Sequence, residues 1–258
     1  MGRLFGTDGV RGVVGQDMNS SFAFRLAYAA GQMLRSNNHR RAVVVGRDTR
    51  ESGEMLEQAV AEGFSAAGLD VWLAGIITTP GVAFLTSSLG EAAGVVISAS
   101  HNPHQYNGIK LFSPLGQKFP DEQEDEISRI FYSLSDSLGT GTAGRGKILS
   151  MNKAEDKYIA FLSGIYGDSL RGMKVVLDCA NGAAYKIAPR LLESLGAQTV
   201  CIGNKPDGKN INADCGALHM DRLRELTQRE GSAAGLALDG DADRALFIDE
   251  QGKMVDGD

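Results

Sequence analysis

Short apolar runs alternate with segments of helical periodicity along the whole chain, and this alternation restricts the fold more than any other feature. The run AVVVG at Ala42–Gly46 is typical of a strand buried on both faces of a sheet. Segments with apolar residues at helical spacing precede and follow it, at Ser20–Leu34 and Glu54–Ala67. Such alternation predicts an α/β fold, with helices covering mixed, mostly parallel sheets.

The same pattern predicts the remaining helices and strands. In the first half we expect strands over Asp70–Ala74, Ala92–Ser98 and Gly108–Phe112, and helices over Val82–Leu89 and Asp121–Leu134. In the second half we expect strands over Lys174–Asp178, Ala197–Ile202, Gly235–Asp239, Ala245–Asp249 and Met254–Val255. Helices are expected there over Lys153–Leu162, Gly182–Leu195 and Met220–Arg229.

A change in composition divides the chain. The stretch Ser135–Gly146 is rich in Gly, Ser and Thr, as linkers are. We therefore predict two consecutive α/β domains, over residues 1–145 and residues 146–258. The last residues, Asp256–Asp258, carry a helix N-cap signal, so we expect the chain to be the N-terminal portion of a longer protein.

Composition and charge exclude several classes of function. The formal net charge is −6, and acids and bases are interspersed without a basic stripe, which argues against nucleic-acid binding. No apolar run is long enough to span a membrane, and the N-terminus lacks an apolar signal core. Cys179, Cys201 and Cys215 lack the spacing of metal ligands, which predicts reduced thiols in a cytoplasmic protein.

The segment LALDGDADRALF carries the strongest chemical signal. Asp239, Asp241 and Asp243 stand two residues apart, and an extended backbone would place all three carboxylates on one side. Two like charges about 4 Å apart repel by roughly 4 kcal/mol at an effective dielectric constant of 20. A cation relieves this repulsion, and hard carboxylate oxygens favour Mg²⁺. The alternative is a solvated acidic loop.

Two other motifs share part of the pattern of this acidic segment. An EF-hand calcium loop needs Gly at its sixth position, where this chain has Arg244. Haloacid-dehalogenase-type phosphatases also have Asp-x-Asp after an apolar strand, but a Thr or Val is usual where this chain has Asp243. A metal-dependent phosphatase with Asp239 as its nucleophile is kept as an alternative function.

A second motif, SASHNP, places Ser100 just after a predicted strand, where α/β proteins build their sites. The flanking glycines of an acyl-hydrolase elbow are missing, and an ordinary turn serine is the alternative. His101 is expected to point away from the serine, because adjacent residues of an extended segment face opposite sides. Lys110 follows ten residues later, and together with a metal cluster this pattern favours phosphoryl transfer.

The third motif is the glycine-rich FGTDGVRG at Phe5–Gly12. Thr7 and Arg11 offer an anion two kinds of donor, although a plain glycine-rich turn is the alternative. The motif lacks the Gly-Lys-Ser/Thr of a Walker loop. In GRDTRESG, Arg47 and Arg50 add positive charge nearby, or belong to another ordinary turn.

Together, FGTDGVRG, GRDTR, SASHNP, NGIK and DGDADR occur in an order and spacing that resemble the α-D-phosphohexomutase superfamily over the whole chain. Ser98 in SASHNP and the stretch Asn210–His219 are most similar to the bacterial phosphoglucosamine mutases. This resemblance implies an isomerase of amino sugar metabolism that converts glucosamine 6-phosphate to glucosamine 1-phosphate for cell-wall precursors. Phosphoglucomutase or phosphomannomutase activity is the alternative within the superfamily.

The resemblance also implies roles for the matching residues. Ser100 would carry the phosphoryl group, and a phosphoserine oxygen would join Asp239, Asp241 and Asp243 in binding Mg²⁺. The bisphosphorylated sugar would form as an intermediate and return its other phosphate to the serine.

Further roles follow from the same resemblance. Arg11 and Lys110 would lie near the reacting groups, with Lys110 as general acid or base, and His101 and Arg244 would line the site. Thr7, Arg11 and Arg244 are our candidates for binding phosphate. At Ala242 this chain departs from the family, which usually has Gly there.

The superfamily has four domains, with its sugar-binding and substrate-phosphate loops in the third and fourth. Residues 1–258 would supply the phosphoserine and the metal, so we expect this chain alone to be weakly active or inactive. The expected partner is a hexosamine phosphate, not nucleic acid or a membrane. Assembly with further copies of the chain is left open.

Overall fold

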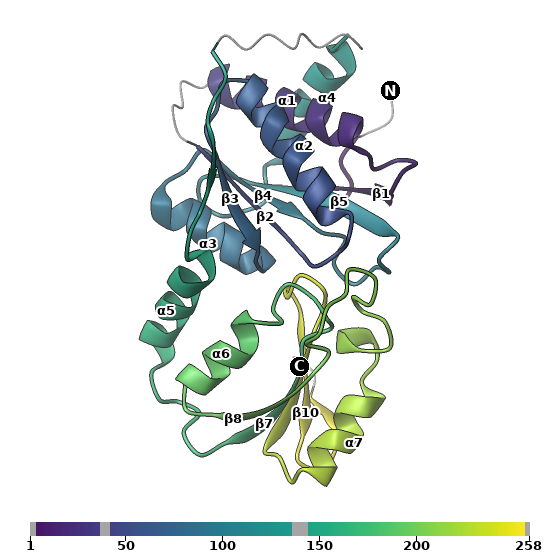
Figure 1. The fold of residues 1–258 in the computed structure, drawn as a ribbon, viewed down its shortest axis with the longest axis vertical. Helices are drawn as coiled ribbons and strands as arrows, with labels where there is room; N and C mark the ends of the chain where they lie inside the picture. Colours follow the sequence, from purple (N-terminus) through teal and green to yellow (C-terminus); the bar gives the residue numbers. More distant parts are fainter. Residues whose placement is uncertain (1–3, 37–41, 136–143, 256–258) are drawn as a thin grey trace.

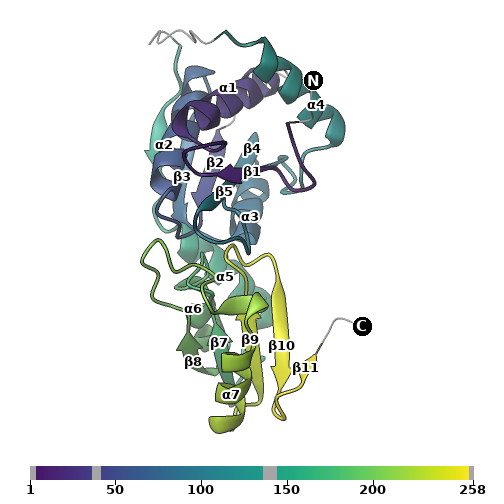
Figure 2. The same cartoon turned by 90° about the vertical axis from the view of Figure 1, so that its right-hand side faces the viewer.

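The computed structural model describes residues 4–36, 42–135 and 144–255. It consists of two α/β lobes stacked along the long axis of the molecule, the first above and the second below in Figure 1. Each lobe has its own mixed sheet, as the alternating sequence pattern predicts. From the side, the β9–β10 loop of the lower lobe is directed at the upper lobe (Figure 2).

The first sheet contains six strands in the order β1-β5-β4-β2-β3-β6. Their bounds are β1 (Val10–Val13), β2 (Val43–Arg47), β3 (Val71–Ile76), β4 (Ala93–Ile97), β5 (Tyr106–Phe112) and β6 (Ile148–Ser150). β2, β3, β4 and β6 pair in parallel, whereas β1 and β5 are antiparallel to their neighbours. Val43 and Val45 of the central strand face one core and Val44 faces the other, so β2 reads as a continuous apolar run.

Helices cover both faces of this sheet. One face is packed by α1 (Ser20–Ser36), α2 (Gly53–Ala66) and α4 (Asp121–Ser133), the other by α3 (Thr79–Leu89) and α5 (Ala154–Tyr166). The start of α3 is fixed locally, because the Thr78 hydroxyl accepts a hydrogen bond from the Gly81 N–H (3.1 Å) and Pro80 occupies the first turn. This cap places Thr79 at the edge of the sheet that faces the second lobe.

The second sheet has the order β11-β10-β9-β7-β8. Its strands are β7 (Lys174–Asp178), β8 (Gln198–Ile202), β9 (Ala234–Leu238), β10 (Ala245–Asp249) and β11 (Met254–Val255). Helix α7 (Asp221–Arg229) packs on one face through Leu223, and α6 (Ile187–Ser194) lies on the other side; the short η1 (Gly216–Leu218) precedes α7. β9 and β10 form an antiparallel hairpin whose connection, residues 239–244, holds the three aspartates.

The structure differs from the sequence predictions at four elements, one of which is the short helix η1, which was not predicted. β1 and β6 were not predicted, and the residues of β6 are exposed, so their side chains show no buried pattern. The helix predicted from Gly182 begins only at Ile187. Pro189 explains this, because a proline lacks the N–H needed in a helix interior and is tolerated only in the first turn.

Strand β6 bears on where the first domain ends. Because Ile148–Ser150 pairs with β3 of the first sheet, we propose that the boundary follows Ser150, a few residues after the predicted one. Most of the predicted linker, and the whole cap at Asp256–Asp258, lie outside the described residues. In the parts of the chain that the structure describes, no helix has the length and apolar character needed to cross a membrane. The three cysteines are free thiols.

Candidate active site between the two domains

Ser100 lies in the loop between β4 and β5, at the edge of the first domain that faces the second. It is fully buried, and its backbone is left-handed, with a φ of 53°. Its N–H donates a hydrogen bond to the Ser98 hydroxyl (2.9 Å). Its own hydroxyl donates across the domain boundary to Asp239 Oδ2 (2.6 Å). The serine and the acidic loop, 139 residues apart in sequence, thus meet directly.

The left-handed backbone at Ser100 also redirects His101. The prediction that His101 points away from the serine is wrong, because the segment is not extended there and His101 Nδ1 lies 3.5 Å from Ser100 Oγ. Arg244 Nη1 lies 3.2 Å from the same ring nitrogen. Partial burial, then the positive charges of Arg244 and Arg11, hold the pKa of His101 below its ordinary value, so the neutral imidazole is favoured.

Arg50 fixes the β4–β5 connection that carries Ser100; this connection and Tyr106, the first residue of β5, are here called the serine loop (residues 98–106). Its side chain is buried, and Nε donates to Asp48 Oδ2 (2.8 Å). Its two terminal nitrogens donate, over 2.6–3.0 Å, to four carbonyls of the loop, those of Ser100, Asn102, Pro103 and Tyr106. From the sequence, Arg50 would either add positive charge near the site or belong to an ordinary turn. In the structure its charge is compensated by Asp48, and its hydrogen bonds fix the loop. Arg47 pairs instead with Glu57 (3.2 Å).

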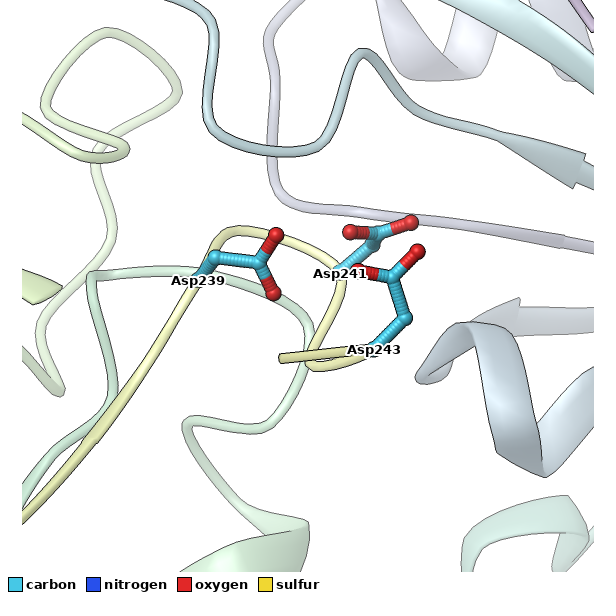
Figure 3. A group of neighbouring side chains, drawn as sticks. All are labelled: Asp239, Asp241 and Asp243. Atoms are coloured by element: carbon cyan, nitrogen blue, oxygen red, sulfur yellow. The ribbon is translucent and has the colours of Figure 1, made fainter. Parts of the chain in front are cut away.

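The loop between β9 and β10 contains Asp239, Asp241 and Asp243, and their side chains lie close together (Figure 3). One carboxylate oxygen from each lies within 4.8 Å of the others. They converge through a tight turn, in which the Ala242 N–H donates to the Asp239 carbonyl (3.1 Å), and not through the extended backbone that we predicted. Ala242 is left-handed, with a φ of 55°.

The triad has the donor chemistry of a cation site. Asp241 Oδ2 accepts from the Thr79 hydroxyl (2.6 Å), but among the described residues its buried Oδ1 has no hydrogen-bond partner. Burial, then repulsion from Asp241, raises the pKa of Asp239 to about 6. An unpaired buried carboxylate oxygen amid like charges fits a hard metal ion that accepts oxygen ligands.

Lys110 of β5 supplies the opposing charge. Its ammonium lies 2.8 Å from Asp241 Oδ2, 3.0 Å from Asp243 Oδ2 and 2.9 Å from Asp8 Oδ2. Burial alone would lower the pKa of Lys110, but attraction to Asp241 and the other two carboxylates outweighs it and raises this pKa. Lys110 is therefore a proton-bearing donor in this arrangement. Asp8, which was not predicted as a site residue, stands between Thr7 and Arg11 in the glycine-rich motif.

A cavity of about 410 Å³ adjoins these charges. Its lining brings together the three residues that we predicted to bind phosphate, Thr7, Arg11 and Arg244. Asp8 also lines it. Asp8 Oδ2 accepts from Arg11 Nη2 (2.7 Å) and so holds the guanidinium at the cavity wall. The cavity thus offers an anion two guanidinium groups and a hydroxyl, beside the acidic triad.

Comparison with known families covers nearly all of the chain. Residues 2–137 match the family model described as phosphoglucomutase/phosphomannomutase, alpha/beta/alpha domain I, and residues 156–252 match the corresponding domain II. A phosphoglucosamine mutase from Desulforamulus reducens is 48% identical over 259 residues, which cover 100% of this chain and 58% of the relative. One from Syntrophotalea carbinolica is 51% identical over 261 residues, covering 99% and 57%. The chain thus spans somewhat more than half the length of these curated relatives.

A solved structure agrees with the sequence matches. The crystal structure of a phosphoglucomutase/phosphomannomutase family protein from Burkholderia thailandensis superposes with a TM-score of 0.84 at 28% sequence identity. The match covers 98% of this chain and 56% of that chain. Since the domain I model alone matches more than half of the 258 residues, this protein belongs to the phosphoglucomutase/phosphomannomutase family.

Proposed function

We propose that this protein, at the full length of its relatives, is a phosphoglucosamine mutase that carries its phosphoryl group on Ser100. The curated names of relatives that are 46–51% identical support this assignment. The observation that carries it is the hydrogen bond of 2.6 Å from Ser100 Oγ to Asp239 Oδ2. This contact sets a buried hydroxyl of one domain against the metal-ligand cluster of the other, which an ordinary turn serine would not require.

We assign Mg²⁺ to Asp239, Asp241 and Asp243, with an oxygen of the phosphorylated Ser100 completing the protein ligands. The phosphoserine itself carries about −1.5 to −2 charges at pH 7, and these add to the charges of the three carboxylates. When bound, the ion supplies charge neutralisation and polarises the phosphoryl group. The buried Asp241 Oδ1 without a hydrogen-bond partner among the described residues supports this use of the triad.

The protein's own residues then divide the work of transfer. The phosphoryl group passes from Ser100 to a free hydroxyl of the sugar phosphate; the sugar oxygen loses a proton and the Ser100 oxygen gains one. The raised pKa of Lys110 favours the ammonium, so we assign Lys110 as the acid in this exchange. Neutral His101 lies beside Ser100 Oγ and lines the site.

Phosphate recognition is assigned to the cavity beside the triad. Arg11, Arg244 and Thr7 line this cavity, and guanidinium groups bind phosphate oxygens through paired N–H donors. The product of the first transfer, a hexosamine bisphosphate, would return its other phosphate to Ser100 and leave as glucosamine 1-phosphate.

The test is the chemistry of the phosphorylated residue. We expect full-length protein treated with Mg²⁺ and glucosamine 1,6-bisphosphate to gain one phosphate on the peptide that contains Ser100, as measured by mass spectrometry. Ser100→Ala should gain none and lose nearly all turnover. Ser150→Ala, which changes an exposed serine of β6, should behave as the unaltered protein.

Hydroxylamine distinguishes a mutase that uses Ser100 from a phosphatase that uses Asp239. A phosphoserine survives this reagent, whereas the acyl phosphate of a phosphatase that uses Asp239 is cleaved. Loss of the phosphate under hydroxylamine, or near-normal turnover of Ser100→Ala, would refute the mutase assignment. Comparison of glucosamine, glucose and mannose phosphates as substrates then separates phosphoglucosamine mutase from phosphoglucomutase or phosphomannomutase.

A further inference from the structure

Asn212 of the second domain holds the serine loop of the first. It lies between β8 and η1, in a segment that extends towards the first domain (Figure 1). Its side-chain amide donates to the carbonyls of Ser100 (2.9 Å) and Asn102 (3.2 Å). Neither contact reaches the serine hydroxyl, so Asn212 acts on the backbone that carries it.

The Ser100 carbonyl is held from three sides. Arg50 Nη2 donates to it from the first domain (2.9 Å), and Asn212 Nδ2 donates from the second. Gly240 closes the third side, because a β-carbon there would lie 2.5 Å from the Ser100 oxygen and 2.9 Å from Asn212 Nδ2. A carbonyl so enclosed fixes the plane of the peptide that follows Ser100.

Asn212 is itself anchored. Its backbone is left-handed (φ 56°), a conformation that asparagine tolerates better than most residues. Its N–H donates to the Ala180 carbonyl (2.8 Å), and the Ala180 N–H donates to the buried carboxylate of Asp178 (2.9 Å). The amide of Asn212 is therefore presented from a fixed backbone.

We propose that Asn212 is a positioning residue that keeps Ser100 in the left-handed conformation from which its hydroxyl points at Asp239. A serine adopts a positive φ only where its surroundings enforce it. Without the amide, the second domain no longer donates this hydrogen bond to the Ser100 carbonyl. The loop then relaxes towards extended backbone, which turns Ser100 Oγ away from Asp239. The catalytic consequence rests on the mutase function proposed above.

The test compares two substitutions in one loop of the full-length protein. Asn212→Gly keeps the left-handed backbone and removes only the amide. Asp214→Gly is the matched control, because Asp214 is exposed, is also left-handed (φ 51°) and lies two residues away. We expect Asn212→Gly to lower kcat about 10- to 100-fold with little change in KM, since small misplacement of a reacting group has effects of this size. Asp214→Gly should stay near the unaltered rate.

A second measurement does not need turnover. Amide hydrogen exchange at residues 100–102 should be faster in Asn212→Gly than in the unaltered protein, and unchanged in Asp214→Gly. Unaltered kcat and exchange in Asn212→Gly would overturn the inference, as would an equal loss in Asp214→Gly. If the unaltered protein carries no phosphate on Ser100, the proposed function fails, while the exchange rates still decide whether Asn212 holds the loop.

Discussion

Ser100 and Ala242 both have left-handed backbones although neither is a glycine. A β-carbon in this region costs roughly 1–2 kcal/mol per residue. At Ser100 the conformation directs a hydroxyl at Asp239, so the strain accompanies a contact that the site uses. At Ala242 the methyl group supplies no ligand to the triad. A glycine at this position would adopt the same turn without the strain.

Ala242→Gly should raise the free energy of unfolding by about 0.5–1 kcal/mol, the relief of strain less the greater entropy of an unfolded glycine. Urea denaturation measures this change. Ala245→Gly, in the extended strand β10, is the control and should instead lower the free energy of unfolding. A loss of stability in Ala242→Gly would mean that the methyl group packs usefully beneath the loop.

At the scale of elements, the serine loop depends on a buried ion pair. Arg50 and Asp48 have fully buried side chains, and their contact of 2.8 Å places a guanidinium beneath the connection from β4 to β5. Burial favours the neutral form and raises the pKa of Asp48, while the charge of Arg50 opposes this shift. Removal of Arg50 leaves a buried carboxylate without its cation and four loop carbonyls without their donor.

Arg50→Met should therefore lower the free energy of unfolding by about 3–5 kcal/mol, the usual cost of breaking a buried pair. Arg47→Met is the control, because Arg47 is partly exposed and its ion-pair partner among the described residues is Glu57. Chemical denaturation gives both values. Addition of Asp48→Asn to Arg50→Met should recover part of the loss, and failure to do so would place the cost in the loop contacts rather than in the unpaired charge.

Strands with buried apolar runs were predictable from the sequence, whereas the edge strands β1 and β6 were not. The strands β2, β4 and β7 are buried, and their continuous apolar runs are the composition that such burial requires. β6 lies at a sheet edge with exposed residues, and β1 pairs with β5 through the glycine-rich motif. Their hydrogen bonds are made by backbone groups, which leave no side-chain pattern to read.

The candidate site divides in the same way. Ser100, Lys110 and the triad were predictable because each stands in a short motif within or next to a strand. Thr79 and Asn212 were not, because each acts through a hydrogen bond across the domain boundary, to Asp241 and to the serine loop. Such contacts depend on how the two domains dock, and no local periodicity encodes this.

At the scale of the whole molecule, polar contacts join the domains around the site. The Thr79 N–H and hydroxyl bind the carbonyl (2.9 Å) and carboxylate (2.6 Å) of Asp241. The Thr49 hydroxyl donates to the Asn181 carbonyl (2.5 Å), and the Glu51 N–H donates to the Gly208 carbonyl (2.9 Å). The contacts of Thr79 thus join the two domains and also hold Asp241, a proposed metal ligand.

Thr79→Val should lower the free energy of unfolding by about 1–3 kcal/mol, because Asp241 then loses a buried donor. It should also speed amide exchange in residues 239–244. Thr227→Val is the control: Thr227 is also buried, but its hydroxyl donates within α7, to the Leu223 carbonyl. Equal exchange of residues 239–244 in the two variants would show that Thr79 does not secure the loop.

The hydroxyl of Ser100 and the three carboxylates belong to domains with separate sheets, 139 residues apart at the Ser100–Asp239 contact. Each domain has its own sheet, and neither alone holds the whole reactive centre. The proposed centre is thus complete only when the two domains are docked, and a partner or solvent condition that separated them would stop the proposed phosphate exchange without unfolding either sheet. An ion bound by residues of both domains would, in turn, favour their docking.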